Sequence, residues 1–398
     1  MPRWRSFQAF LADAAQAPSD AERQALVNDL LAARTVWPWI EGQRATFIYV
    51  DDRAERVALN LDTIQGDPPF DPMINLVGTN LWYVTREFAP DDLLDYMLAI
   101  NDPMTPLAQE ADIVKRVAQH WHADERNPLR MDTAQMQVSV LRMRAARPFP
   151  NWAALNAVPR GSVHEHPLES AELGFSGRKL WVYTPPGYEA SGLAYPLLIL
   201  HDGQWAMGPL QVPYIADALI KHERMQPAVI AMVQSGTQEE RSRDFIANEA
   251  HYAFLLTELL PQLQTAYRID SRAVGIGGVD MGAVAAARAA LRNPVVFSRL
   301  IMISAPLGRG QYEDKLRELV FTFEGAERLP ERIFQSVGRY EARSRFYRPA
   351  LALREALMGR RDTHYRFVEI GSGHGLVGFK SIFPEALAWA FPGAAFDK

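Results

Sequence analysis

The sequence predicts an α/β protein, a mainly parallel sheet covered by helices on both faces, preceded by a small antiparallel β-sandwich. From about residue 160 onward, apolar strand-like runs alternate with helical segments. That alternation is typical of a sheet buried on both faces. Between residues 46 and 100, short β-rich runs are separated by turn residues such as those at 66–69 and 78–80, which is typical of an antiparallel sandwich. A chain of 398 residues favours two domains over one core.

The first 40 residues are predicted to form a helical arm. Apolar residues recur at helical spacing from residue 6 to residue 34, and Ser19 is a candidate N-cap with Glu22 three residues later. We therefore expect three parts: a helical arm at 1–40, a β-sandwich with its linker at 41–160, and an α/β domain at 161–398.

Each region contributes its own set of expected elements. The strands expected in the first region are 46–50, 57–61, 81–85 and 95–100. Residues 101–160 contain several prolines and little periodicity, so irregular structure and linker are expected there. The strands expected in the second region are 179–184, 195–200, 228–233, 273–277, 300–304, 319–323 and 365–370. The helices expected there include 245–267, 282–292 and 340–358.

Composition excludes several classes of function. The chain carries 42 basic and 47 acidic residues, a formal charge of −5, which argues against a nucleic-acid footprint and gives no reason to expect a membrane surface. It contains no cysteine, so disulfides, thiolate nucleophiles and cysteine-based metal sites are excluded. No uninterrupted apolar segment of a secretory signal opens the sequence, and a cytoplasmic protein without a cofactor is expected.

One short stretch carries the strongest signal for chemistry, Gly278-Val279-Asp280-Met281-Gly282. An apolar strand precedes it and an alanine-rich helix follows it. This is the pattern of the sharp strand-to-helix turn that presents a nucleophile, with aspartate where serine is usual. The glycines leave room for strand and helix to meet, and the central side chain lies where the helix dipole favours negative charge. The Met281 amide is a candidate oxyanion donor.

Other candidates follow neighbouring strands, where ligands bind in open α/β sheets. Gly203 and Gln204, after the strand at 195–200, are candidates for the second oxyanion donor. Glu324 and Glu327 follow the expected strand at 319–323, and His374 follows the last strand. The order elbow residue, acid, histidine is that of the α/β-hydrolases.

Two further groups have a functional and a structural interpretation. Arg241 and Arg243, together with Trp205, could contact an anionic substrate, although a salt bridge at a helix start is the safer interpretation for the arginines. Two His-x-His pairs, at 120–122 and 164–166, have the alternation that places side chains on one face. No acidic or cysteine cluster joins them, and no metal site is expected.

These motifs resemble the esterase-D and enterochelin-esterase group of α/β-hydrolases. The matching segments are HDGQWA at 201–206, the helix ending in TELLPQL at 243–263, the elbow region at 277–304 and EIGSGHG at 369–375. Ahead of them, 66–73, 76–102 and RNPLRMD at 126–132 resemble the immunoglobulin-like N-terminal domain of the enterochelin-esterase branch. The resemblance implies a cytoplasmic enzyme that cleaves ester bonds in ferric siderophores, with Asp280 at the nucleophile position, His374 as base and Glu327 as acid.

The sequence departs from that family at the reacting centre, and three hypotheses follow. The serine is absent, and Gly375 and Leu376 replace the usual Asp and Trp after the histidine. The chain could be an ester hydrolase that works without serine, acting on a siderophore-type ester. It could use Asp280 as a nucleophile toward a saturated carbon, as in an epoxide or alkyl halide, with His374 activating water. It could instead be a non-catalytic relative that binds a small ligand or partner in the inherited pocket.

Overall fold

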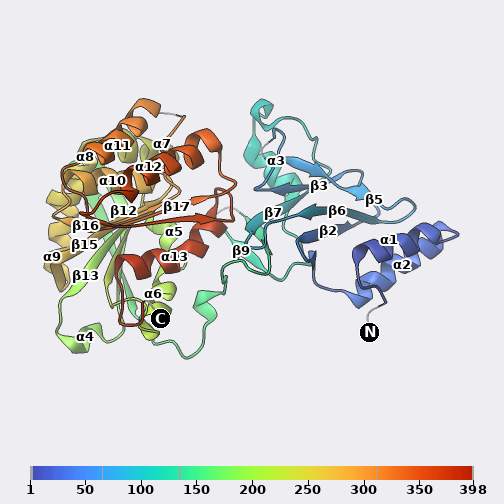
Figure 1. Ribbon diagram of the computed structural model, residues 1–398, viewed down its shortest axis with the longest axis horizontal. Helices are drawn as coiled ribbons and strands as arrows, with labels where there is room; N and C mark the ends of the chain where they lie inside the picture. The colour runs from blue at the N-terminus through green and yellow to red at the C-terminus, as the bar shows by residue number, and fades with distance from the viewer. Residues whose placement is uncertain (1–2, 65, 134–135, 311, 397–398) are drawn as a thin grey trace. The chain divides into compact units, whose positions relative to one another are not determined.

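The computed structural model describes residues 3–64, 66–133, 136–310 and 312–396. The chain divides into two compact units (Figure 1). The first comprises Met1–Arg147 together with Gly371–Val377, and the second comprises Pro148–Ile370 together with Gly378–Lys398. The first unit therefore includes a short segment from near the C-terminus, the loop that carries His374. The predicted division at residues 40 and 160 remains a prediction.

Two helices open the first unit, α1 (Phe7–Gln16) and α2 (Asp20–Ala33). The predicted cap is confirmed, because the Ser19 hydroxyl accepts a hydrogen bond from the Glu22 amide. The apolar faces of both helices pack on the first sheet of this unit. The buried cluster they form consists of Trp4, Phe7, Phe10, Ala14, Val27, Leu30, Trp37, Trp39, Ile48 and Leu81.

Two antiparallel sheets follow in the first unit. The first sheet has the order β1 (Trp39–Glu41), β2 (Arg44–Val50), β6 (Leu81–Glu87), β5 (Ile74–Asn75). The second has the order β4 (Phe70–Pro72), β3 (Val57–Leu61), β7 (Leu93–Ile100), β10 (Gln137–Arg142), β9 (Arg130–Asp132), with β8 (Trp121–His122) paired to β7. Phe47 of one sheet and Tyr96 of the other stack edge to face with ring centroids 4.8 Å apart. All four strands predicted for this region are confirmed.

The expectation of irregular structure at 101–160 is wrong in part. The segment contains η1 (Leu107–Gln109), α3 (Ile113–His120), the strands β8, β9 and β10, and η2 (Trp152–Ala154). A buried ion pair anchors α3, because Arg116 donates to both carboxylate oxygens of Asp102. The elements of this segment are only two to eight residues long, too short to show a clear periodic pattern in the sequence, which explains the error.

The second unit is built on an eight-stranded sheet of order β11-β12-β14-β13-β15-β16-β17-β18. β11 and β12 run antiparallel to their neighbours, and the six strands from β14 to β18 in the sheet pair in parallel. The strands are β11 (Ser162–Ser170), β12 (Phe175–Thr184), β13 (Tyr195–His201), β14 (Val229–Val233), β15 (Ile269–Val279), β16 (Phe297–Ile303), β17 (Arg332–Gly338) and β18 (His364–Ile370). This confirms the predicted mainly parallel sheet.

Helices cover both faces of this sheet. In Figure 1, α10, α11 and α12 lie over one face, and α6 and α13 lie over the other. The α-helices are α4 (Tyr188–Ser191), α5 (Gly203–Met207), α6 (Val212–Lys221), α7 (Gln238–Ser242), α8 (Ala250–Ala253), α9 (Leu260–Ala266), α10 (Met281–Arg292), α11 (Glu313–Gly325), α12 (Arg348–Met358) and α13 (Leu376–Ala390). Three π-helical segments lie beside them, η3 (Arg243–Ala247), η4 (Phe254–Leu259) and η5 (Arg343–Tyr347).

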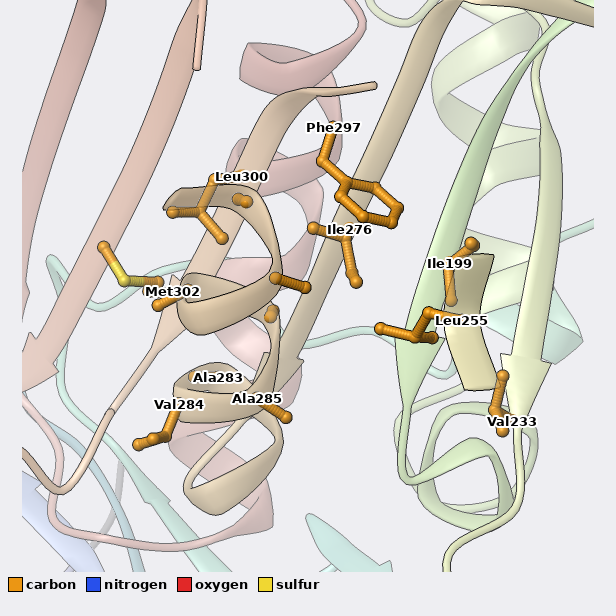
Figure 2. Packing of buried hydrophobic residues seen from close by; sticks show 14 of the residues in the cluster. Ile199, Val233, Leu255, Ile276, Ala283, Val284, Ala285, Phe297, Leu300 and Met302 are labelled. Atoms are coloured by element: carbon orange, nitrogen blue, oxygen red, sulfur yellow. The ribbon is translucent and has the colours of Figure 1, made fainter. Parts of the chain in front are cut away.

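The core of the second unit forms where α10 packs on the centre of the sheet. Small residues along the helix allow this close packing, and Ala283 and Ala285 belong to the same buried cluster as Ile276 and Phe297 of the strands (Figure 2). Both helix and strands are buried here, which explains the near-continuous apolar runs of the sequence. The core therefore fixes the position of the turn between β15 and α10.

The structure corrects one predicted strand in this unit. Residues 319–323 belong to the helix α11, and the strand between α11 and α12 is β17. Leu316, Leu319 and Phe323 are the buried positions of α11, spaced three and four residues apart as on one face of a helix. The predicted helix at 245–267 is a chain of short helical segments interrupted by π turns, and the helical part of 340–358 begins at η5.

In the part of the chain that the structure describes, no helix is both long enough and apolar enough to cross a lipid bilayer.

Candidate functional site

The turn between β15 and α10 has the geometry of a nucleophile elbow. Asp280 is the residue at the turn, with φ 51° and ψ −126°, a combination that non-glycine residues rarely adopt. Its amide donates to the carbonyl of Ile303 at 2.9 Å, so the adjacent strand β16 holds the turn. The side chain lies at the amino end of α10, where the helix dipole is positive. The strand, turn and helix predicted for this stretch are confirmed.

The two elbow glycines are required by close approach. A Cβ atom at Gly278 would lie 2.5 Å from the carbonyl carbon of Gly282, inside the first turn of α10. A Cβ atom at Gly282 would lie 2.9 Å from the Cβ of His201 and 2.8 Å from Oδ2 of Asp202. Real Cβ atoms do not approach other atoms so closely, so these positions admit only glycine without a shift of the backbone.

A buried arginine occupies the space beside the elbow carboxylate. Arg241, on α7, donates from Nη1 to Oδ2 of Asp280 at 2.9 Å. It also makes a two-pronged pair with Asp202, from Nε to Oδ1 and from Nη2 to Oδ2, both at 2.7 Å. The guanidinium lies 4.7 Å from the centre of the Trp205 ring. Arg241 is 3% exposed, and the three charged groups therefore form one buried network.

The two aspartates stabilise the charged form of Arg241. Burial acts to lower the pKa of Arg241, but hydrogen bonds and charge from Asp202 and Asp280 outweigh it, and the pKa is raised. The arginine is positioned by a capping box, in which Thr237 and Glu240 satisfy each other's backbone amides at the start of α7. The carboxylate of Asp280 is thus held by a permanent cation.

The candidate oxyanion donors lie at the ends of neighbouring strands. β13 and β15 are adjacent and parallel, so Gly203 after β13 and Met281 after β15 are at the same edge of the sheet. A Cβ at Gly203 would lie 2.5 Å from the carbonyl carbon of Met232, which requires glycine. The side chain of Gln204 is tied to the loop after β14, since its Nε2 donates to Ser235 Oγ at 2.6 Å. The oxyanion role of these amides stays a prediction.

The strand expected at 319–323 is wrong, so chain order no longer supports Glu327 as the acid, and its assignment by resemblance stays a prediction. Glu324 lies in α11, and Glu327 is an exposed residue in the segment that enters the amino end of β17. The acid should follow a strand, at the carboxyl edge where the elbow lies.

A buried acidic residue, Glu341, follows β17 and is a further candidate for the acid that the sequence pattern did not single out. Glu341 is 2% exposed and accepts hydrogen bonds at Oε1 from the Ser304 hydroxyl at 2.5 Å and from the Gly338 amide at 2.9 Å. Ser304 itself has a φ of 53°, directly after β16. The signal in the sequence was RIFQSVGRYE at 332–341, an apolar strand followed by an acid.

His374 lies in the loop Gly371–Val377, which belongs to the first unit by its contacts. Within that unit, the amide of the preceding residue, Gly373, donates to Oδ2 of Asp62 at 3.2 Å. The action of His374 on a group held at Asp280 stays a prediction from chain order.

Two buried histidines lie behind the elbow and were not predicted. His201 Nδ1 is 3.1 Å from the carbonyl of Gly277, and its Nε2 is 2.9 Å from Nε2 of His251. A carbonyl can only accept, so His201 carries its hydrogen on Nδ1, and His251 donates to its Nε2. Burial lowers the pKa of both imidazoles. The pair is therefore neutral; His201 links β13 to β15, and His251 links α8 to β13.

The remaining predicted residues lie in separate places. Arg243 is half exposed and pairs with Asp244 at 2.9 Å, which fits the salt-bridge interpretation. His166 contacts the Tyr267 hydroxyl through Nε2 at 2.5 Å. Among residues 3–64, 66–133, 136–310 and 312–396, no group of three or more His, Asp or Glu side chains has an arrangement that could hold a metal ion.

Comparison with known proteins agrees with this geometry. The enterobactin esterase of Shigella flexneri, solved in the presence of enterobactin, is similar with a TM-score of 0.73 at 20% identity, covering 88% of this chain and 94% of that chain. The ferric enterobactin esterase of Salmonella typhimurium is similar with a TM-score of 0.74 at 19% identity, covering 91% and 98%. These likenesses show the fold. No curated protein sequence matches the chain.

A family profile described as "Putative esterase" matches residues 170–388, more than half of the chain. The match includes the elbow, Arg241, Glu341 and His374. The chain belongs to this esterase family.

Proposed function

We propose that this protein binds a siderophore-type ester at the elbow of its α/β domain without forming an acyl-enzyme. The observation that carries the proposal is the ion pair between Asp280 and Arg241, 2.9 Å apart and buried. A carboxylate that attacked an ester carbonyl would form a mixed anhydride and would have to expel an alkoxide, a far poorer leaving group than the carboxylate itself. The guanidinium further stabilises the unreacted carboxylate.

The electrostatics of the elbow also oppose the family's usual reaction. A serine elbow leaves the amino end of its helix free to stabilise a developing oxyanion. Here the negative charge of Asp280 already lies at the amino end of α10, balanced by Arg241. The developing negative charge of a tetrahedral intermediate would be repelled by the carboxylate of Asp280. A neutral ester carbonyl could still accept hydrogen bonds from the amides of Met281 and Gly203.

The ligand class follows from the family and from the similar structures. Enterobactin esterase of Shigella flexneri was solved with enterobactin, and also with 2,3-dihydroxy-N-benzoyl-serine. An ester of catechol-acylated serine combines aromatic rings with several carbonyl acceptors. Trp205, beside Arg241 at the elbow, offers an aromatic surface for such a ring.

The experiment compares wild type with Asp280→Ser and Asp280→Asn on ferric enterobactin. Binding is measured by quenching of tryptophan fluorescence, and hydrolysis by chromatography of released dihydroxybenzoyl-serine. All three proteins should bind, and only Asp280→Ser should release product. Asp280→Asn is the matched control, since it removes the charge without supplying a hydroxyl. Product from the wild type would establish ester hydrolysis without serine, and failure of the wild type to bind would overturn the ligand assignment.

A second candidate uses Asp280 as a nucleophile toward a saturated carbon. The observation in its favour is the retained backbone conformation of Asp280, which presents the side chain as a nucleophile elbow does. Attack of the Asp280 carboxylate on an epoxide carbon would form an ester as the ring C–O bond breaks, with the ring oxygen taking a proton from water, and water activated by His374 would then hydrolyse that ester. Intact-mass analysis of a His374→Gln variant incubated with styrene oxide should show an adduct on Asp280 if this candidate holds. An unmodified His374→Gln protein would exclude this candidate. The double variant Asp280→Asn, His374→Gln is the control and should stay unmodified in either case.

A further inference from the structure

We propose that Asp62 and Asp95 of the first unit are positioning residues for His374. Asp62 accepts a hydrogen bond from the Gly373 amide, and both aspartates pack against the glycines on either side of His374, which holds the loop 371–377 in place. This inference goes beyond the proposed function. It concerns how the histidine is held, whatever group that histidine serves.

The glycines of Gly371-Ser372-Gly373-His374-Gly375 have a packing reason. None of the three has a φ in the left-handed region that favours glycine. A Cβ at Gly373 would lie 2.4 Å from Cγ of Asp62, and one at Gly375 would lie 3.2 Å from Oδ2 of Asp95. The two glycines that flank His374 therefore make room for two aspartate side chains of the N-terminal unit.

Two hydrogen bonds fix the first half of the same loop. Oδ2 of Asp62 accepts from the Gly373 amide at 3.2 Å, next to His374. At the start of the loop, the carbonyl of Gly371 accepts from the amide of Leu93 at 2.7 Å, where β7 begins. A Cβ at Gly371 would lie 2.8 Å from Oδ1 of Asp92, so a third aspartate closes on the loop there. The loop therefore packs as part of the first unit.

The two aspartates act as a pair with one proton. Burial raises the pKa of Asp62 well above its ordinary value, and the charge and hydrogen bond of Asp95 raise it further, while the Gly373 amide acts in the opposite direction. Two carboxyl groups in contact cannot both ionise at ordinary cost, so Asp62 keeps its proton and donates to Asp95. The protonated pair can approach the loop without repulsion.

The charged neighbours on the adjoining elements do not cancel this arrangement. Asp92, just before β7, packs against Gly371 of the same loop, and His374 is the titratable residue of the loop itself. The basic residue of the adjoining strand β10 is Arg142, and its guanidinium donates to the carbonyls of Ala146 and Arg147. As the pH rises from the ordinary aspartate range, about 4, toward the raised pKa of Asp62, Asp62 keeps a proton while the loop is docked that it would release if the loop were free. Docking therefore weakens through that window.

Hydrogen–deuterium exchange of peptides covering residues 371–377 tests the inference, without ligand and with rates corrected for intrinsic exchange. Asp62→Ala should exchange at least about tenfold faster than wild type, the factor expected when a buried amide loses its acceptor. Asp62→Asn keeps an oxygen for Gly373 and a donor for Asp95, so it should restore protection and abolish the pH dependence. Asp52→Asn, an exposed aspartate of the same unit, is the matched control and should resemble wild type.

A spectroscopic measurement separates positioning from a general loss of structure. The imidazole proton resonance of His374, assigned with a His374→Gln variant, should shift in Asp62→Ala and return in Asp62→Asn. Peptides of the α/β unit should keep wild-type protection in all variants. Equal loop exchange in wild type and Asp62→Ala, or failure of Asp62→Asn to restore protection, would overturn the inference. Because no siderophore is used, these outcomes do not depend on whether the ligand assignment holds.

Discussion

Arg241 bridges Asp280 and Asp202, at 2.9 Å and 2.7 Å, and this one cation joins the elbow to the loop after β13. The backbone turn of the elbow is thus retained, but the carboxylate at its tip is paired with a cation. An aspartate at this turn would leave a buried negative charge if it stood alone, and the arginine explains why the fold tolerates it. Changes to this network should therefore affect stability as well as function.

Replacing Arg241 with Met should destabilise the protein by about 3–5 kcal/mol, because Asp202 and Asp280 would remain buried without their cation. Asp280→Asn should cost less, since Arg241 keeps both bonds to Asp202. Urea denaturation followed by far-UV circular dichroism measures both changes. Arg272→Met is the control, because Arg272 is exposed and its partner Asp270 also reaches solvent, and it should change the free energy of unfolding by less than about 1 kcal/mol. Equal effects of Arg241→Met and Arg272→Met would contradict the buried network.

Gly282→Ala should destabilise the protein by about 1–3 kcal/mol, the usual range for overpacking a buried site. The added methyl would meet the Cβ of His201 and the carboxylate of Asp202, so the pair between Asp202 and Arg241 should be displaced as well. Thermal unfolding followed by circular dichroism gives the change. Gly359→Ala is a matched control, since a Cβ there meets nothing within 4 Å and its φ is −87°. If Gly282→Ala were as stable as that control, the elbow could accommodate a Cβ atom at position 282, and the close-packing argument would be contradicted.

The acid assignment can be decided in the background of Asp280→Ser. In that variant, we expect Glu341→Gln to reduce hydrolysis of p-nitrophenyl acetate at least about tenfold, as removal of an orienting carboxylate does in hydrolase triads. Glu327→Gln should leave the rate unchanged, because Glu327 is exposed at the opposite end of β17. Glutamine keeps an acceptor for Ser304 and Gly338, so the comparison tests charge with little change in packing. A larger loss with Glu327→Gln would restore the original assignment.

The contrast between Glu327 and Glu341 shows which parts of the candidate site could be predicted from the sequence and which could not. The elbow was predictable because glycines, an apolar strand and an alanine-rich helix are local features. The strand β17 was missed because LVFTF at 319–323 has the apolar, β-branched look of a strand, whereas its helical spacing appears only over the longer stretch of α11. One misplaced strand placed the candidate acid at the opposite edge of the sheet from Glu341.

Tertiary pairs could not be predicted from local patterns. Asp202 lies 39 residues from Arg241, and Asp62 lies 311 residues from Gly373. Neither separation leaves a periodic trace in one sequence. The GSGHG turn was identified by its histidine, but the reason for its glycines, the approach of aspartates from the first unit, became visible only in three dimensions.

A buried lysine gives a prediction about pH. Lys380 on α13 is 6% exposed and lies 5.3 Å from the centre of the Phe149 ring, and burial lowers its pKa to about 8. Because the unfolded chain keeps the ordinary lysine value near 10.4, the unfolded state binds more protons between about pH 8 and pH 10.4. The contribution of Lys380 to the free energy of unfolding therefore rises with pH through that window and is least favourable at neutral pH, where the buried amine is charged.

Lys380→Met should remove this penalty and stabilise the protein at pH 7 by roughly 1–2 kcal/mol, allowing for partial solvent screening of the charge. The advantage over wild type should shrink as the pH rises from 8 to 10, because the wild-type amine loses its proton in the folded state. Urea unfolding at pH 7, 8, 9 and 10 measures the difference between the two proteins, which cancels the titration of other groups. Lys179→Met, at a half-exposed lysine that pairs with Glu165, is the control and should show no such trend. A constant difference across the series would mean that Lys380 keeps its charge when folded.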